Sequence, residues 1–156
     1  MTATTGNCFI GDYIGRFEPG QLVMLGPDLP HNWVSEIPEG GSVPERCVVV
    51  QFGAAFIEGL QERFPELREV DALLKASRCG LSFGADTARR ARPLMEALCA
   101  TDAGTRQARM FLELLETLLA DGSARTLSSM ACDASDGAFD AAGSMKGVLD
   151  YLRQNY

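Results

Sequence analysis

Residues 17–33, Phe-Glu-Pro-Gly-Gln-Leu-Val-Met-Leu-Gly-Pro-Asp-Leu-Pro-His-Asn-Trp, place two tight turns around one short apolar run. The turns lie at residues 18–20 and 26–28, because proline presets φ and glycine allows a positive φ. Between them, residues 22–25 have the length and composition of a strand. This stretch therefore predicts β-structure whose strands return through rigid corners.

The region on both sides of this stretch also has the patterns of β-strands. Gly11 and Asp12 suit a hairpin turn, and residues 46–52 are short and rich in β-branched side chains. We predict strands at residues 7–10, 13–17, 21–25, 31–35 and 46–52, with the last as the clearest of the five. Residues 1–52 are thus predicted to form a β-region.

The pattern changes to a helical one after Gly53. We predict helices at residues 54–63, 65–77, from 86 or 87 to about 100, and 105–120, with a brief returning strand at 80–83 and an extended stretch at 124–130. Residues 53–130 then form a helical subdomain. Residues 131–144 are small and polar, as in a linker, and residues 145–156 begin another helix.

Composition limits the classes of function. The chain has 156 residues, 46% of them hydrophobic, and a net charge of −7. Such an acidic balance argues against nucleic-acid binding by this chain alone, because that affinity comes largely from neutralised phosphates. No apolar run approaches the roughly 18 residues that span a bilayer, and residues 1–7 lack the features of a signal peptide. We therefore expect a cytoplasmic protein without a membrane partner, whose five cysteines are reduced.

Two stretches of the chain resemble one family of proteins. Residues 17–33 fit the form F-x-P-G-x-L-V-x-L-G-P-x-L-P-H-x-W, and residues 148–156 read Val-Leu-Asp-Tyr-Leu-Arg-Gln-Asn-Tyr. The first is similar to the sensory domain of bacterial transcription regulators of the AraC/XylS type. The second resembles the opening of the first helix of their DNA-binding domain, which holds two helix-turn-helix units.

The resemblance implies an α+β fold, in which a partial cupin-like antiparallel β-barrel or sheet precedes a helical dimerisation subdomain. It implies a homodimer that senses a small-molecule effector. DNA would be bound only through a helix-turn-helix domain that does not follow residue 156. A full cupin barrel needs more strands before Gly11 than the chain offers, so the barrel is open, completed by a partner, or shortened at its start.

Candidate ligand-binding residues lie on the predicted strands. His31 is the only histidine, and a firmly held metal ion needs three or more protein ligands, so we expect no metal or other cofactor. His31 either binds an effector at the barrel mouth or satisfies the backbone of a turn. Trp33 lies on the same strand face and either walls a pocket or fills the core. Phe9, Tyr13 and Met24 are further candidates.

The predicted helix at residues 105–120 has an unusually wide apolar stripe. This stripe either packs against the rest of the same chain or against its twin in a dimer. The residues predicted for the dimer interface are Ala108, Phe111, Leu112, Leu115, Leu118 and Leu119.

Three functions are compatible with these patterns. The first is the effector-sensing and dimerisation domain of an AraC-like regulator. The second is a small cupin enzyme such as an isomerase or dioxygenase, which the single histidine and the absence of a Gly-x-Ser-x-Gly or Gly-Lys-Ser/Thr motif disfavour. The third is a dimerisation module without a ligand. We predict no catalytic residue.

Overall fold

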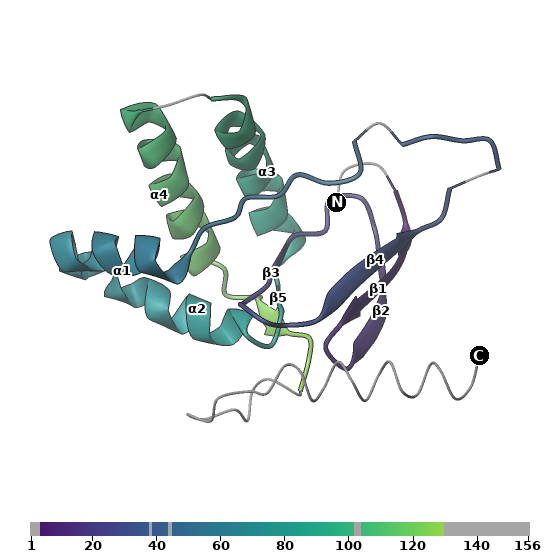
Figure 1. The fold of residues 1–156 in the computed structure, drawn as a ribbon, viewed down its shortest axis with the longest axis horizontal. Helices are drawn as coiled ribbons and strands as arrows, with labels where there is room; N and C mark the ends of the chain where they lie inside the picture. The colour runs from purple at the N-terminus through teal and green to yellow at the C-terminus, as the bar shows by residue number, and fades with distance from the viewer. Residues whose placement is uncertain (1–3, 38, 44, 102–103, 130–156) are drawn as a thin grey trace.

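A computed structural model describes residues 4–37, 39–43, 45–101 and 104–129 and has a mixed α+β architecture. Its described part contains two small antiparallel sheets and four α-helices, and these strands form no closed barrel. The first sheet lies on one side of the molecule and the helices on the other, with the second sheet between them (Figure 1). The linker predicted at residues 131–144 and the helix predicted at 145–156 lie outside the described residues.

The larger sheet, sheet A, contains β1 (Gly6–Ile10), β2 (Tyr13–Phe17) and β4 (His31–Ser35), in the order β2-β1-β4. Both strand pairs are antiparallel. The turn between β1 and β2 begins at Gly11, whose φ of 57° is one that glycine adopts without strain. The predicted hairpin and the predicted strand at residues 31–35 are therefore confirmed.

The smaller sheet, sheet B, joins segments that are far apart in the sequence. It contains β3 (Val23–Met24), β5 (Leu81–Ser82) and β6 (Arg125–Thr126), in the order β3-β5-β6. The predicted strands at residues 21–25 and 80–83 are confirmed in shortened form. Because β6 follows the last helix, this sheet ties the end of the described chain to its beginning.

The helices lie close to their predicted positions. They are α1 (Ala54–Arg63), α2 (Val70–Ser77), α3 (Ala85–Ala100) and α4 (Thr105–Leu119), and a 3₁₀ turn, η1 (Pro65–Glu69), precedes α2. Pro65 stands at the start of η1, where its missing N–H leaves no hydrogen bond unmade. Asp121 closes the start of α3, because its Oδ2 accepts a hydrogen bond of 2.8 Å from the Gly84 N–H.

The strand predicted at residues 46–52 is wrong. The segment is coil and runs past α3 to the start of α1 (Figure 1). Its side chains still alternate, with Val48, Val50 and Phe52 half-buried and Val49 exposed. A strand also needs a neighbour that accepts and donates its backbone hydrogen bonds. Among the described residues, this segment makes no backbone–backbone hydrogen bond.

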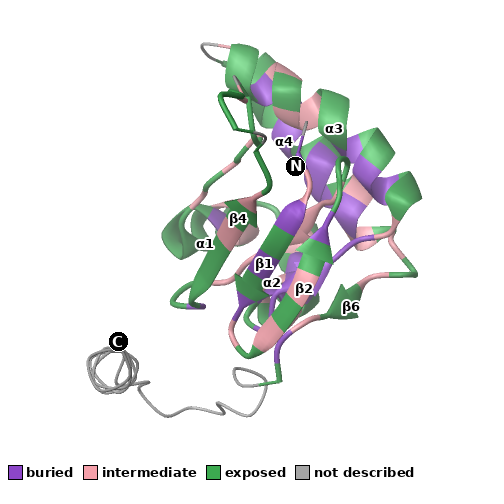
Figure 2. Ribbon diagram, turned by 90° about the vertical axis from the view of Figure 1, so that its right-hand side faces the viewer, coloured by how far each residue is buried: buried purple, intermediate pink, exposed green. Residues whose placement is uncertain are grey.

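Two hydrophobic clusters form the core. The larger lies among the helices and sheet B and includes Val70, Phe83 and Ala91. The smaller lies under sheet A and contains Cys8, Ile10, Phe17 and Leu29, with Trp33 packed against it. Sheet A buries only one face, so burial alternates along β1, as Figure 2 shows.

The wide apolar stripe of α4 faces mainly this larger cluster. Phe111, Leu115 and Leu118 are buried there in a single chain, because α1, α2 and α3 cover that side of α4. For these three residues the structure shows the first of the two predicted arrangements, packing against the rest of the same chain, and their part in a dimer interface stays a prediction. Ala108 and Leu112 are exposed and Leu119 is half-buried.

The cysteines differ in state. Cys8, Cys47 and Cys99 are free, as predicted, whereas Cys79 is disulfide-bonded, so the expectation of reduced thiols is wrong for that residue. Burial raises the pKa of the Cys8 thiol, which keeps it protonated near neutral pH. Separately, none of the helices in the described ranges is both long and apolar enough to span a membrane.

Candidate functional site

A cavity of about 990 Å³ lies where the β-region meets the helices. Its size is at the upper end of the range of about 300–1,000 Å³ that is common for small-molecule sites. Apolar side chains supply most of its wall. They come from the β-region (Leu22, Val23, Met24, Leu25, Trp33), from the extended segment (Val48, Val49, Val50, Phe52) and from the helices (Ile57, Leu74, Leu114, Leu115, Leu118).

Trp33 forms part of the cavity wall and also packs against the core of sheet A. It stands opposite Cys8 in the β1–β4 register, on the buried face of the sheet. Its indole Nε1 is buried and has no hydrogen-bond partner among the described residues. A buried donor without an acceptor costs about 1–3 kcal/mol. Any rearrangement or ligand that brings an acceptor to this N–H is therefore stabilised. Both readings of Trp33, as wall and as core, therefore apply.

His31 lines the cavity at the start of β4. Its Nδ1 lies 2.8 Å from the carbonyl oxygen of Leu29. A carbonyl can only accept, so in the neutral ring Nδ1 carries the proton and Nε2 is left as an acceptor. The ring also contacts Trp33 edge-on, with 5.5 Å between centroids. His31 thus satisfies the turn backbone and still offers one nitrogen to a ligand.

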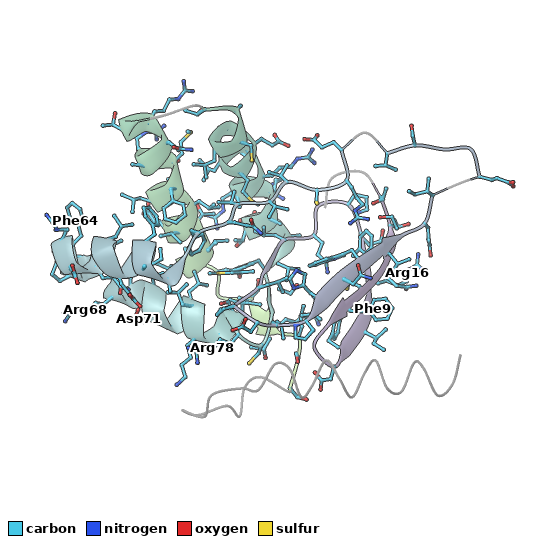
Figure 3. All side chains as sticks on the ribbon, viewed as in Figure 1. Phe9, Arg16, Phe64, Arg68, Asp71 and Arg78 are labelled. Carbon is cyan, nitrogen blue, oxygen red and sulfur yellow. The ribbon has the colours of Figure 1, made fainter. Side chains whose placement is uncertain are left out.

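The other three predicted ligand-binding residues divide between wall and surface. Met24 lines the cavity, whereas Phe9 and Tyr13 do not. Phe9 is on the opposite, exposed face of sheet A (Figure 3), because it alternates with the buried Cys8. Tyr13 packs against the core of sheet A instead, and a Cβ added at Gly15 would lie 2.2 Å from its hydroxyl. Phe9 and Tyr13 are therefore not part of this cavity, and their role in ligand binding stays a prediction.

Charge on the cavity wall is opposite to that of the whole chain. The chain has 14 basic and 21 acidic residues, but the wall has four basic residues (Arg46, Lys75, Arg78, Arg92) and two acidic ones (Glu58, Asp71). Figure 3 shows Asp71 and Arg78 near opposite ends of α2.

Two of these six charged residues have partners within the described ranges of the chain. Arg92 forms an ion pair of 2.7 Å with Glu96, and Asp71 accepts a hydrogen bond of 2.7 Å from Gln61. Arg46, Lys75 and Arg78 form no ion pair with any other residue that the structure describes. The wall therefore favours an anionic group over a cationic one.

The described residues contain no group of three or more His, Cys, Asp or Glu side chains placed to hold a metal ion. Cys47 lines the cavity as a free thiol, and the only imidazole there is already bonded to Leu29. What this arrangement can do directly is enclose an apolar molecule and hydrogen-bond one end of it.

Sequence reasoning missed most of the cavity wall. The segment 46–53 lines the cavity throughout, and all four helices contribute to the rest of its wall. One signal was available: alternating apolar residues at 46–52 predict an extended segment with one inward face. The sequence pattern does not show which elements this face lies against, because these are helices that are distant in the sequence.

Comparison with known proteins adds no relative: no protein-family model, curated protein or solved structure matches this chain.

Proposed function

We propose that this chain is the effector-sensing and dimerisation domain of an AraC-like transcription regulator, and that the cavity is its effector site. The observation that carries the proposal is that the cavity is shared by the β-region and all four helices. A ligand shifts a conformational equilibrium only if it binds two arrangements differently. A molecule that touches both parts of the fold at once can do so.

The effector is expected to be mainly apolar with one anionic group. The apolar wall favours burial of a hydrophobic body, and Arg46, Lys75 and Arg78 attract a negative group. His31 Nε2 can accept a hydrogen bond from a hydroxyl or amide on the same molecule.

The test uses two dyes with the same aromatic skeleton. 1-Anilinonaphthalene-8-sulfonate carries a sulfonate and N-phenyl-1-naphthylamine does not, and Trp33 is the only tryptophan, so energy transfer from it reports binding nearby. We expect both dyes to bind saturably and the sulfonate to bind more tightly. Absence of saturable transfer for both dyes would reject the cavity as a ligand site.

A matched pair of variants locates the binding. Val48→Phe fills the cavity from its wall, whereas Val34→Phe adds the same bulk on the exposed face of sheet A. We expect Val48→Phe to weaken dye binding at least about tenfold, equal to about 1.4 kcal/mol, and Val34→Phe to leave it unchanged. Equal weakening by both variants would place the dyes elsewhere.

The dimerisation part of the proposal is supported by apolar surface that one chain leaves uncovered. Leu112 on α4 is 39% exposed and Phe56 on α1 is 52% exposed. Phe56 packs edge-on against Phe111 of α4, with 5.5 Å between ring centroids, so the uncovered surface of α1 lies beside α4. A second copy of the chain is the partner we propose for it.

A further inference from the structure

A carboxylate on the β1–β2 turn holds the last described residues of the chain. Asp12 Oδ1 accepts hydrogen bonds from the Ser128 hydroxyl at 2.6 Å and from the Ser129 N–H at 2.9 Å. Its Oδ2 accepts a third from the Ser129 hydroxyl. These bonds to Ser128 and Ser129 hold the pKa of Asp12 well below its usual value, so the carboxylate is charged near neutral pH. We call this set of three residues the Asp12 clasp.

The same turn holds the residues that lead into the cavity wall. The Gly11 N–H donates a hydrogen bond of 2.8 Å to the Pro30 carbonyl. Pro30 lies between Leu29, whose carbonyl holds the His31 ring, and His31 itself, which begins β4. Two adjacent residues of one turn therefore bond to the cavity edge and to the end of the described chain.

Close packing makes this junction stiff. Leu29 is buried, and Cβ atoms added at Gly11 and Gly80 would lie 3.3 and 3.4 Å from its two methyl groups. A Cβ at Gly11 would also lie 2.2 Å from the Ser128 hydroxyl. The Ser128 N–H is bonded to the Cys79 carbonyl at 2.8 Å. A packed junction of this kind moves as a unit rather than deforming gradually.

We propose that the Asp12 clasp couples the cavity to Ser128 and Ser129, the last described residues of the chain. The inference rests on the proposed sensory function, because it names the route by which an occupied cavity acts on these two residues. A ligand that displaces residues 29–31 displaces the turn bonded to them, and with it the acceptor for Ser128 and Ser129. Coupling between two sites is reciprocal, so breaking the clasp must also change the cavity.

The experiment needs no knowledge of the natural ligand. Asp12→Asn keeps the shape of the side chain but removes its charge and one of its acceptors. We expect a red shift of Trp33 emission, stronger quenching of Trp33 by acrylamide, and a change of about fivefold or more in affinity for 1-anilinonaphthalene-8-sulfonate. Ser129→Ala, at an exposed position, removes one bond of the clasp and should give a smaller change of the same sign.

Asp121→Asn is the matched control. Asp121 Oδ1 also accepts from a serine, at 2.6 Å from both the N–H and the hydroxyl of Ser123, and Oδ2 accepts from Gly84. Its bonds lead to the start of α3 and not to residues 29–31. Because α3 also lines the cavity, this control is judged by Trp33 emission alone, which we expect the variant to leave unchanged.

Two outcomes would overturn the coupling. One is a folded Asp12→Asn variant, judged by circular dichroism, whose Trp33 emission equals that of the parent; the other is an equal change in Asp121→Asn, which would indicate general loosening. If the dyes fail to bind the parent while Trp33 still responds to Asp12→Asn alone, the ligand site fails and the mechanical link stands.

Discussion

A glycine can be required either because the backbone has a positive φ or because there is no room for a Cβ atom. Two glycines of this fold show these two requirements separately. Gly20 and Gly80 both have positive φ, at 87° and 67°. An added Cβ meets nothing within 4 Å at Gly20, but lies 2.6 Å from an Ile10 methyl group at Gly80. Glycine is therefore needed at position 80 for two reasons: the turn has a positive φ, and sheet A packs too closely there to leave room for a side chain.

Substituting alanine at these two positions should measure the difference. Gly20→Ala is expected to lower the free energy of unfolding by about 1–2 kcal/mol through backbone strain alone. Gly80→Ala should lower it by a further 1–3 kcal/mol or so, because the new methyl group overpacks Ile10. Urea denaturation followed by circular dichroism gives both values. An equal decrease in the free energy of unfolding for both variants would mean that Ile10 moves aside for the new methyl group at no cost.

The sequence carries part of this residue-scale information. Alternation correctly predicts that His31 and Trp33 share a strand face. It does not say which residues of β1 face the same way, because a slip of one residue in register exchanges the two faces. The observed register sets Cys8 opposite Trp33, which turns Phe9 outward. Hydrogen bonds such as those to Asp12 join residues more than a hundred positions apart and have no local signal.

At the scale of elements, local patterns predict conformation better than they predict partners. The four helices and most of the strands follow from periodicity and turn residues. Segment 46–52 has the composition and alternation of a strand, yet no neighbour among the described residues pairs with its backbone. The stripe on α4 is likewise visible in the sequence, but its division between core and surface depends on which other elements cover it.

That division gives a prediction for α4. Leu112→Glu places a charge on exposed surface and should convert a dimer into a folded monomer. Leu115→Glu buries a charge at a position only 2% exposed, and should instead reduce the free energy of unfolding by about 4 kcal/mol or more. Light scattering coupled to size exclusion measures the mass, and thermal unfolding measures the stability. A Leu112→Glu variant that keeps the parent's dimeric mass would exclude this face of α4 from the interface.

At the scale of the whole molecule, two carboxylates form hydrogen bonds between segments that are far apart in the sequence. Asp12 holds Ser128 and Ser129 to the hairpin of sheet A, and Asp121 holds Gly84 at the start of α3. Each of them joins the chain near residue 125 to an element that lies earlier in the sequence. The stability of the whole chain should therefore depend on whether these two side chains are charged.

The sign of that dependence follows from the direction of the pKa shifts. Hydrogen bonds from Ser128 and Ser129 lower the pKa of Asp12, and the hydrogen bond from Ser123 lowers that of Asp121. A carboxyl group with a lowered folded-state pKa stabilises the fold above its unfolded pKa, about 3.9 for aspartate, and loses that contribution as the pH falls towards the folded value. We expect the urea midpoint to be steady from pH 7 to about 5 and to fall below about pH 4. The double variant Asp12→Asn/Asp121→Asn should start lower at pH 7 and fall less steeply, because the groups that gain protons are gone. If the urea midpoint of the double variant falls equally steeply below pH 4, the loss of stability in acid comes from other carboxylates.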